Sequence, residues 1–279
     1  LLIKRDVILG FYKCLYLLLA IRRESMNGEL SQICHIVISA RKATKNNAEL
    51  VFEDEKYINS VKFYFLPRKR IFFLKKDVAY SVPEWFEICR RNGITDIKCL
   101  MPTKVKDRAI LGFANTNRSS IVCFNKNGQV TYFAANWEFN REKEGWDVVY
   151  QEYEWKNPPA GKPEFQDNTE EFKKVLGEIE NLAYSIGADG FAKLFHKAFA
   201  ALEGNAEYDL RAKVPDIPKP YQNLYMAVMY ADVYGAMGSW NDSPPYMAHE
   251  KGLDAEYDRL SDELLTQIRL ATLYAVNEF

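Results

Sequence analysis

Hydrophobic and polar positions repeat with two different periods along this chain. Between residues 61 and 155 apolar residues recur at every second position in several short runs, the pattern of half-buried β-strands. Residues 30–45 and much of 168–277 carry apolar residues three and four positions apart, as amphipathic helices do. The pattern predicts an α+β protein, with an N-terminal, mostly antiparallel sheet and flanking helices, followed by a C-terminal four-helix region.

Turn and cap residues divide the first part of the chain into short elements. Pro67 is expected to join two strands in a hairpin, and Asn127-Gly128 offers the positive-φ residues of a second hairpin turn. Ser81 and Glu84 have the spacing of a helix capping box. Because the connections are short, most strands should run antiparallel. The expected strands cover residues 61–66, 70–75, 97–101, 109–113, 120–124, 129–134 and 146–155.

Residues 157–166 are expected to be a linker, because they contain three prolines and a glycine. The charge changes sign at the same place. Residues 1–160 carry 26 Lys and Arg against 18 Asp and Glu, and residues 161–279 carry 11 against 20. We therefore expect an α+β domain at residues 26–156 and a helical domain at 167–279. Opposite charges would attract the two halves or two copies; alternatively, the basic half presents a patch to an anionic partner.

Residues 7–21 are almost continuously apolar and allow three interpretations. The run is shorter than the roughly 20 residues of a membrane span, and no signal-peptide cleavage site follows it. It fits a buried or surface-docked helix. We favour a third hypothesis, in which residues 1–25 are a translated leader and the natural protein starts at Met26, because purine-rich codons for residues 22–25 would resemble a ribosome-binding site. A membrane partner is expected only if residues 7–21 are an anchor.

The five cysteines are odd in number and never occur in Cys-x-x-Cys spacing, which indicates reduced thiols of a cytoplasmic protein. The chain has no phosphate-binding glycine loop and no paired metal-ligand spacing, so we expect neither cofactor nor metal. Basic residues around Phe72 and Phe73 could bind single-stranded nucleic acid, but they more simply protect an edge strand. A nucleic-acid partner is not expected.

Residues 234–242 (YGAMGSWND) combine more glycines and short polar side chains, together with a tryptophan, than a plain helix end requires. Gly235 and Gly238 supply positive-φ or close-approach positions, and the polar residues can bond nearby backbone. One interpretation is a helix–loop–helix corner in which Trp240 fills the core. The other is a binding loop that presents four residues to a partner: Ser239, Trp240, Asn241 and Asp242.

This stretch, together with the Leu-rich helix that follows it, resembles a Gly-Gly-Met-Gly-Ser-aromatic-Asn-Asp signature of small helical bacterial proteins, some of them immunity-like partners of toxins. The resemblance covers about the last 60 residues, and Ala236 replaces the second Gly. It implies a bacterial source and no particular chemistry.

Two functions follow from these observations. The first is a cytoplasmic, non-enzymatic binding or regulatory protein that contacts a protein partner through the loop, because a buried aromatic with polar neighbours is a typical interface anchor. The alternative is a hydrolase-like enzyme. Its acid–base site would use Asp242, His249 and Glu250, where a carboxylate and an imidazole occur close together in sequence.

Overall fold

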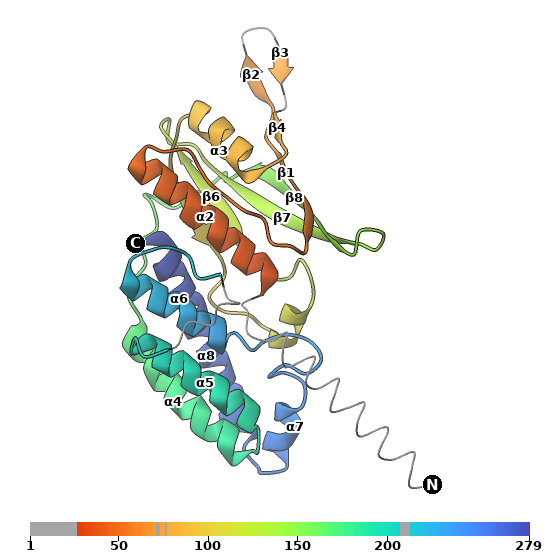
Figure 1. The fold of residues 1–279 in the computed structure, drawn as a ribbon, viewed down its shortest axis with the longest axis vertical. Helices are drawn as coiled ribbons and strands as arrows, with labels where there is room; N and C mark the ends of the chain where they lie inside the picture. Colours follow the sequence, from red (N-terminus) through yellow and green to blue (C-terminus); the bar gives the residue numbers. More distant parts are fainter. Residues whose placement is uncertain (1–26, 71–72, 76, 207–212) are drawn as a thin grey trace.

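The computed structural model describes residues 27–70, 73–75, 77–206 and 213–279. The apolar run at residues 7–21 and Cys14 lie outside the described residues. The protein is an elongated molecule with a six-stranded sheet at one end and packed helices at the other (Figure 1). The predicted α+β class is confirmed.

The sheet has the strand order β4-β1-β8-β7-β6-β5. All neighbouring strands are antiparallel except β1 and β8, which are parallel, so the prediction of a mostly antiparallel sheet is confirmed. The expected turn at Asn127-Gly128 joins β6 to β7, and Gly128 has a φ of +81°. The strands are β1 (Ile58–Tyr64), β4 (Val78–Ala79), β5 (Ile94–Leu100), β6 (Ser120–Asn125), β7 (Val130–Asn140) and β8 (Gly145–Glu154).

Two predicted strand assignments are wrong. Among the described residues, the run at 61–66 does not pair with residue 70 or with 73–75; β1 pairs with β8 and with the short β4 instead. The intervening chain forms its own ribbon of β2 (Arg68–Arg70) and β3 (Phe73–Lys75), which projects beyond the sheet (Figure 1). Residues 109–113 were expected to be a strand, but a 3₁₀ helix, η1 (Arg108–Gly112), occupies them. The Asp107 side chain accepts from the Ala109 N–H and starts this turn (2.9 Å).

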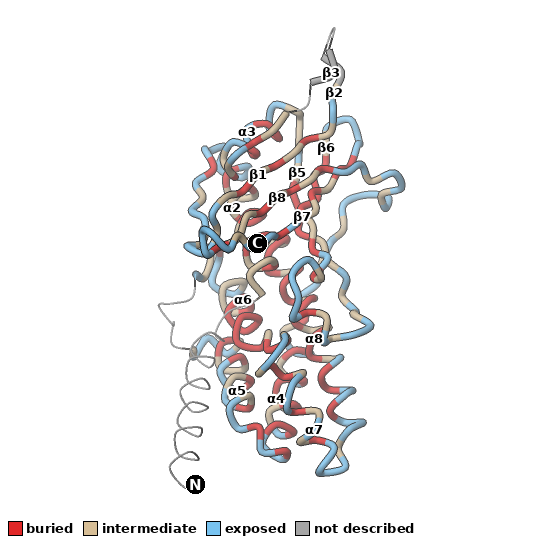
Figure 2. The backbone as a smooth tube through the Cα atoms, turned by 90° about the vertical axis from the view of Figure 1, so that its right-hand side faces the viewer, coloured by how far each residue is buried: buried red, intermediate tan, exposed pale blue. Residues whose placement is uncertain are grey.

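The helices α2 (Gly28–Asn46) and α3 (Val82–Arg91) cover one face of the sheet (Figure 2). Ser81 caps α3 as predicted, accepting from the Glu84 N–H at 3.3 Å. Glu84 does not close the capping box on Ser81; its carboxylate accepts from the N–H of Tyr80 instead. Beneath these helices the sheet packs large aromatic side chains, including Phe63 stacked on Tyr150 at 4.7 Å. This face is the centre of the core in the sheet half.

Over its described residues, the helical half contains the four long helices that the sequence predicts and one short helix that it does not. Each long helix packs against two of the others, so they form a bundle. Asn168, the expected N-cap, makes no capping bond; Asp167 caps the helix by accepting from the Thr169 N–H (2.9 Å). The helices are α4 (Thr169–Ser185), α5 (Asp189–Leu202), α6 (Lys219–Ala231), the short α7 (Pro244–His249) and α8 (Asp254–Asn277).

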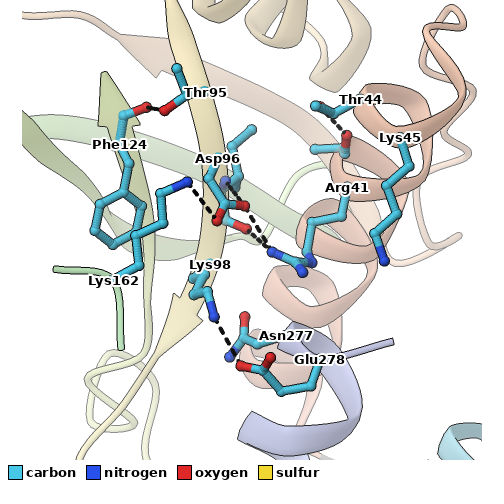
Figure 3. A network of polar contacts seen from close by, with 12 residues as sticks. Arg41, Thr44, Lys45, Thr95, Asp96, Lys98, Phe124, Lys162, Asn277 and Glu278 are labelled. Atoms are coloured by element: carbon cyan, nitrogen blue, oxygen red, sulfur yellow. Dashed lines mark hydrogen bonds and ion pairs between the residues drawn. The ribbon is translucent and has the colours of Figure 1, made fainter. Parts of the chain in front are cut away.

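The end of α8 joins the two halves at the sheet edge. Asn277 is fully buried; its amide donates to the Cys99 carbonyl (2.9 Å) and its side-chain oxygen accepts from the Cys99 N–H (2.8 Å). Next to it, the Lys98 ammonium on β5 contacts Glu278, as Figure 3 shows. The same ammonium donates to the carbonyl of Pro163. One continuous cluster of buried apolar residues runs through the sheet half and the bundle (Figure 2).

Candidate functional site

The loop between α6 and α7 holds the predicted binding residues, and its polar side chains bond to the loop itself. Gly238 has a φ of +76°, and its N–H donates to the Asp242 carboxylate at 2.5 Å. The Ser239 hydroxyl donates to the Gly235 carbonyl (2.8 Å) and accepts from the Asn241 N–H (3.2 Å). These bonds explain why glycine and short polar residues are concentrated here, because together they hold residues 235–242 in one conformation.

Trp240 is an internal anchor of this loop. Its side chain is fully buried, and its indole N–H donates to the Ser261 hydroxyl on α8 at 2.7 Å. The Trp240 carbonyl accepts from the Tyr257 hydroxyl at 2.6 Å. The rings of Phe191 and Phe195 on α5 meet the indole edge-to-face, each at 5.2 Å. The geometry is that of the core-filling corner, so any contact that Trp240 supports with a partner is indirect.

A second loop, which begins with η1, is fastened to the first. The Asn241 amide donates to the Arg108 carbonyl at 3.0 Å. Gly112 lies so close to the other loop that an added Cβ would sit 2.3 Å from the Ala236 nitrogen. The Arg108 guanidinium bonds to Asp258 and Asp262 on α8. We call residues 108–116 and 235–242 the paired loops.

The paired loops present apolar side chains to solvent. Met237 is 79% exposed and Phe113 is 65% exposed. Ala236 and Asp242 beside them are also exposed. Neither Met237 nor Phe113 was predicted as a site residue, because a single apolar residue in a loop carries no periodic signal. Only Met237 lies within the conspicuous motif.

The structure separates the three candidate catalytic residues into different local pairs. His249 Nδ1 lies 2.9 Å from the Asp254 carboxylate, and Glu250 accepts from the Tyr246 hydroxyl at 2.9 Å. Asp242 is bonded to the loop backbone. All three are exposed, and no hydrogen bond or ion pair between described residues joins Asp242 to His249 or Glu250. The three residues therefore take part in three separate local contacts.

A buried polar cluster lies under the paired loops and was not predicted. The Arg269 side chain on α8 is almost fully buried and donates to the Asn117 side chain (3.2 Å) and to the Pro102 carbonyl. Arg269 and Asn117 line a cavity with Asn27 and Asp232; its volume is about 10 Å³, the size of one water molecule. Burial raises the pKa of Asp232, although the Asn27 N–H and Arg269 partly offset this effect. The cluster links the chain segments at the junction of the two halves.

A third feature lies on the sheet face opposite α2 and α3. Leu100, Val122, Tyr132 and Trp155 line a groove of about 380 Å³, together with charged side chains that include Arg118 and Lys156. We call it the sheet groove. The strand alternation that places Ile121 and Phe133 in the core turns Val122 and Tyr132 to this other face. No local sequence pattern predicts this groove.

Comparison of this chain with protein-family models, curated proteins and solved structures found no match. Within the described ranges, no group of three or more His, Cys, Asp or Glu side chains could hold a metal ion. No helix in the described part of the chain has both the length and the apolar composition needed to cross a membrane.

Proposed function

We propose that this protein is a non-enzymatic binding or regulatory protein and that a protein partner docks on the paired loops. The observation that carries the proposal is the exposure of Met237 and Phe113 on loops that the molecule holds rigidly from beneath. Exposed apolar side chains on a fixed backbone suit partner binding, because little conformational freedom is lost when they are buried.

In this proposal each predicted binding residue has a separate role. Trp240 and Asn241 fix the loops to the bundle and to η1, and Ser239 fixes the loop internally. Asp242 is exposed and adds one negative charge beside Met237. The finer proposal, an immunity-like partner of a bacterial toxin in the cytoplasm, rests on the motif resemblance and on the four described cysteines, all of them buried free thiols.

The test is affinity purification of the tagged protein from native lysate, with Met237→Asp and Phe113→Asp as variants. Val51, which is 87% exposed, gives a matched control in Val51→Asp. A stoichiometric protein that binds the wild type and Val51→Asp, but neither loop variant, supports the proposal. A partner that all four proteins retain would place the interface elsewhere and contradict it. Thermal melting of each variant checks that the fold is intact.

A further inference from the structure

The sheet groove is apolar at its base and belongs to a cluster separate from the main core. Val122, Phe124 and Val130 form this second cluster, and Leu100, Tyr132 and Trp155 pack against it. Tyr132 also stacks on Tyr153 of β8, with 5.4 Å between ring centroids. The volume of about 380 Å³ lies at the lower end of the range for ligand pockets and accommodates a large apolar side chain.

The charged residues of the groove are predominantly basic. Arg118 and Lys156 are exposed there, with Glu154 as the acidic residue of the lining. Neither cation forms an ion pair with any residue that the structure describes, whereas Arg108 and Arg41 are both paired with carboxylates. Two cations without carboxylate partners beside an apolar groove are complementary to an acidic ligand.

We infer that the sheet groove binds an acidic peptide segment of a partner protein, with one large apolar side chain in the groove and carboxylates at Arg118 and Lys156. A nucleic acid is a poorer fit, because the Tyr132 ring, which would have to stack on a base, is already stacked on Tyr153. This surface lies outside the paired loops, so the inference goes beyond the proposed function and does not depend on it.

The experiment uses fluorescently labelled acidic peptides with a central Leu, Phe or Trp, and anisotropy titration of the full chain. An acidic peptide with a central Ser and a basic peptide with a central Leu are the comparison probes. Arg118→Glu/Lys156→Glu removes the cations, and Ser120→Phe fills the groove beside Val122 without changing its charge. Arg141→Glu/Lys143→Glu, at the exposed β7–β8 turn, reverses two charges elsewhere.

We expect saturable binding of the acidic apolar peptides that weakens about tenfold in both groove variants and not in the turn variant. Binding should also weaken with salt. Absence of saturable binding by any acidic apolar peptide, or equal binding by Arg118→Glu/Lys156→Glu, overturns the inference. Tighter binding of an oligothymidine probe, lost in the same variant, overturns it in favour of a nucleic acid. Self-association that Ser120→Phe abolishes, without peptide binding, overturns it in favour of a second copy.

Discussion

Asn277 acts as a substitute for a neighbouring strand. Its carboxamide has the same donor and acceptor as a peptide group, and it meets both backbone groups of Cys99 on the edge strand β5. All of these atoms belong to buried residues, so water cannot replace the lost partner if the amide is removed.

Asn277→Ala should therefore lower the free energy of unfolding by about 3 kcal/mol, because two buried backbone groups lose their partners. Chemical denaturation measures the change. Asn127→Ala is the control, since the Asn127 side chain accepts from the Gln129 N–H at an exposed turn and its loss should cost less than about 1 kcal/mol. Equal costs at the two positions would show that the Cys99 contact is unimportant.

Trp240→Phe and Trp240→Ala separate the two interpretations of the motif. The Phe variant keeps an aromatic ring in the pocket but leaves the Ser261 hydroxyl without its donor, so we expect a loss of about 1–2 kcal/mol in denaturation. The Ala variant should lose about 3–5 kcal/mol. If Trp240 is only an internal anchor, Trp240→Phe retains the partner in affinity purification. Loss of the partner from a folded Trp240→Phe protein would contradict a purely internal role for the indole.

Elements with a strong local signal were predictable. The β6–β7 hairpin and the cap of α3 depend on residues a few positions apart, here Asn127-Gly128 and Ser81. The partner of β1 was not predictable, because β1 pairs in parallel with β8, which follows more than 80 residues later. The η1 turn was also missed, since five residues are too few to distinguish alternation from a helical turn.

Replacing Gly112 and Gly177 with alanine should change the stability of the protein in opposite directions. At Gly112 a Cβ would collide with the backbone of Ala236, so Gly112→Ala should destabilise the protein by about 1–3 kcal/mol and loosen the paired loops. Gly177 lies within α4 with no atom near the added Cβ, and Gly177→Ala should stabilise by about 0.5–1 kcal/mol. Thermal and chemical denaturation of both variants tests the signs. A neutral Gly112→Ala would mean that the loops are not in close contact.

His35 should make the packing of α2 on α6 sensitive to pH. It stacks on Tyr225 and contacts the Lys213 carbonyl, and burial lowers its pKa below the ordinary 6.5, although Glu55 opposes this effect. The folded protein takes up the proton on His35 less readily than the unfolded chain does. The contribution of neutral His35 to the free energy of unfolding is therefore complete above pH 6.5, and it is lost as the pH falls through the lowered pKa.

Denaturation between about pH 8 and 5 measures this dependence. The His35 contribution to the slope is at most about 1.4 kcal/mol per pH unit. His35→Gln should flatten the dependence, whereas His196→Gln should retain it, because His196 is exposed beside Glu180. An unchanged slope in His35→Gln would assign the dependence to other groups.

At the scale of the whole molecule, the contrast in charge between the two halves appears as ion pairs across their junction. Arg108 contacts Asp258 and Asp262, and Lys98 contacts Glu278. The two aspartates are more than 60% exposed, so their pairs with Arg108 contribute little to stability. Arg269 is buried and donates hydrogen bonds across the same junction. Its removal would leave the Pro102 carbonyl and the Asn117 side chain without this donor.

We therefore expect Arg269→Leu to cost about 3–5 kcal/mol. The exposed double variant Asp258→Asn/Asp262→Asn should cost about 1 kcal/mol or less. Calorimetry at low and high salt distinguishes them further, since only the exposed pairs are screened. A larger loss in the aspartate variant would mean that surface charge, rather than the buried cluster, holds the halves together.

The candidate site was only partly visible in the sequence. The motif marked one of the paired loops, because Gly238 and Asp242 together form a local bend. The second loop lies more than 100 residues away, and it is Asn241 and Gly112 that bring it beside the motif. The sheet groove depends on which way each strand faces, and this follows from register rather than from any local pattern.

The contact between Asn277 and Cys99 spans 178 positions, and this separation has a consequence for biosynthesis. A ribosome that makes the chain in order releases the strands of the sheet well before the end of α8. During that interval the backbone N–H and carbonyl of Cys99 on the edge strand β5 lack the partner that Asn277 provides, and a strand of a neighbouring nascent chain could pair with this edge. Polysomes that translate this message slowly through the final helix should therefore yield more insoluble product than those that translate it quickly.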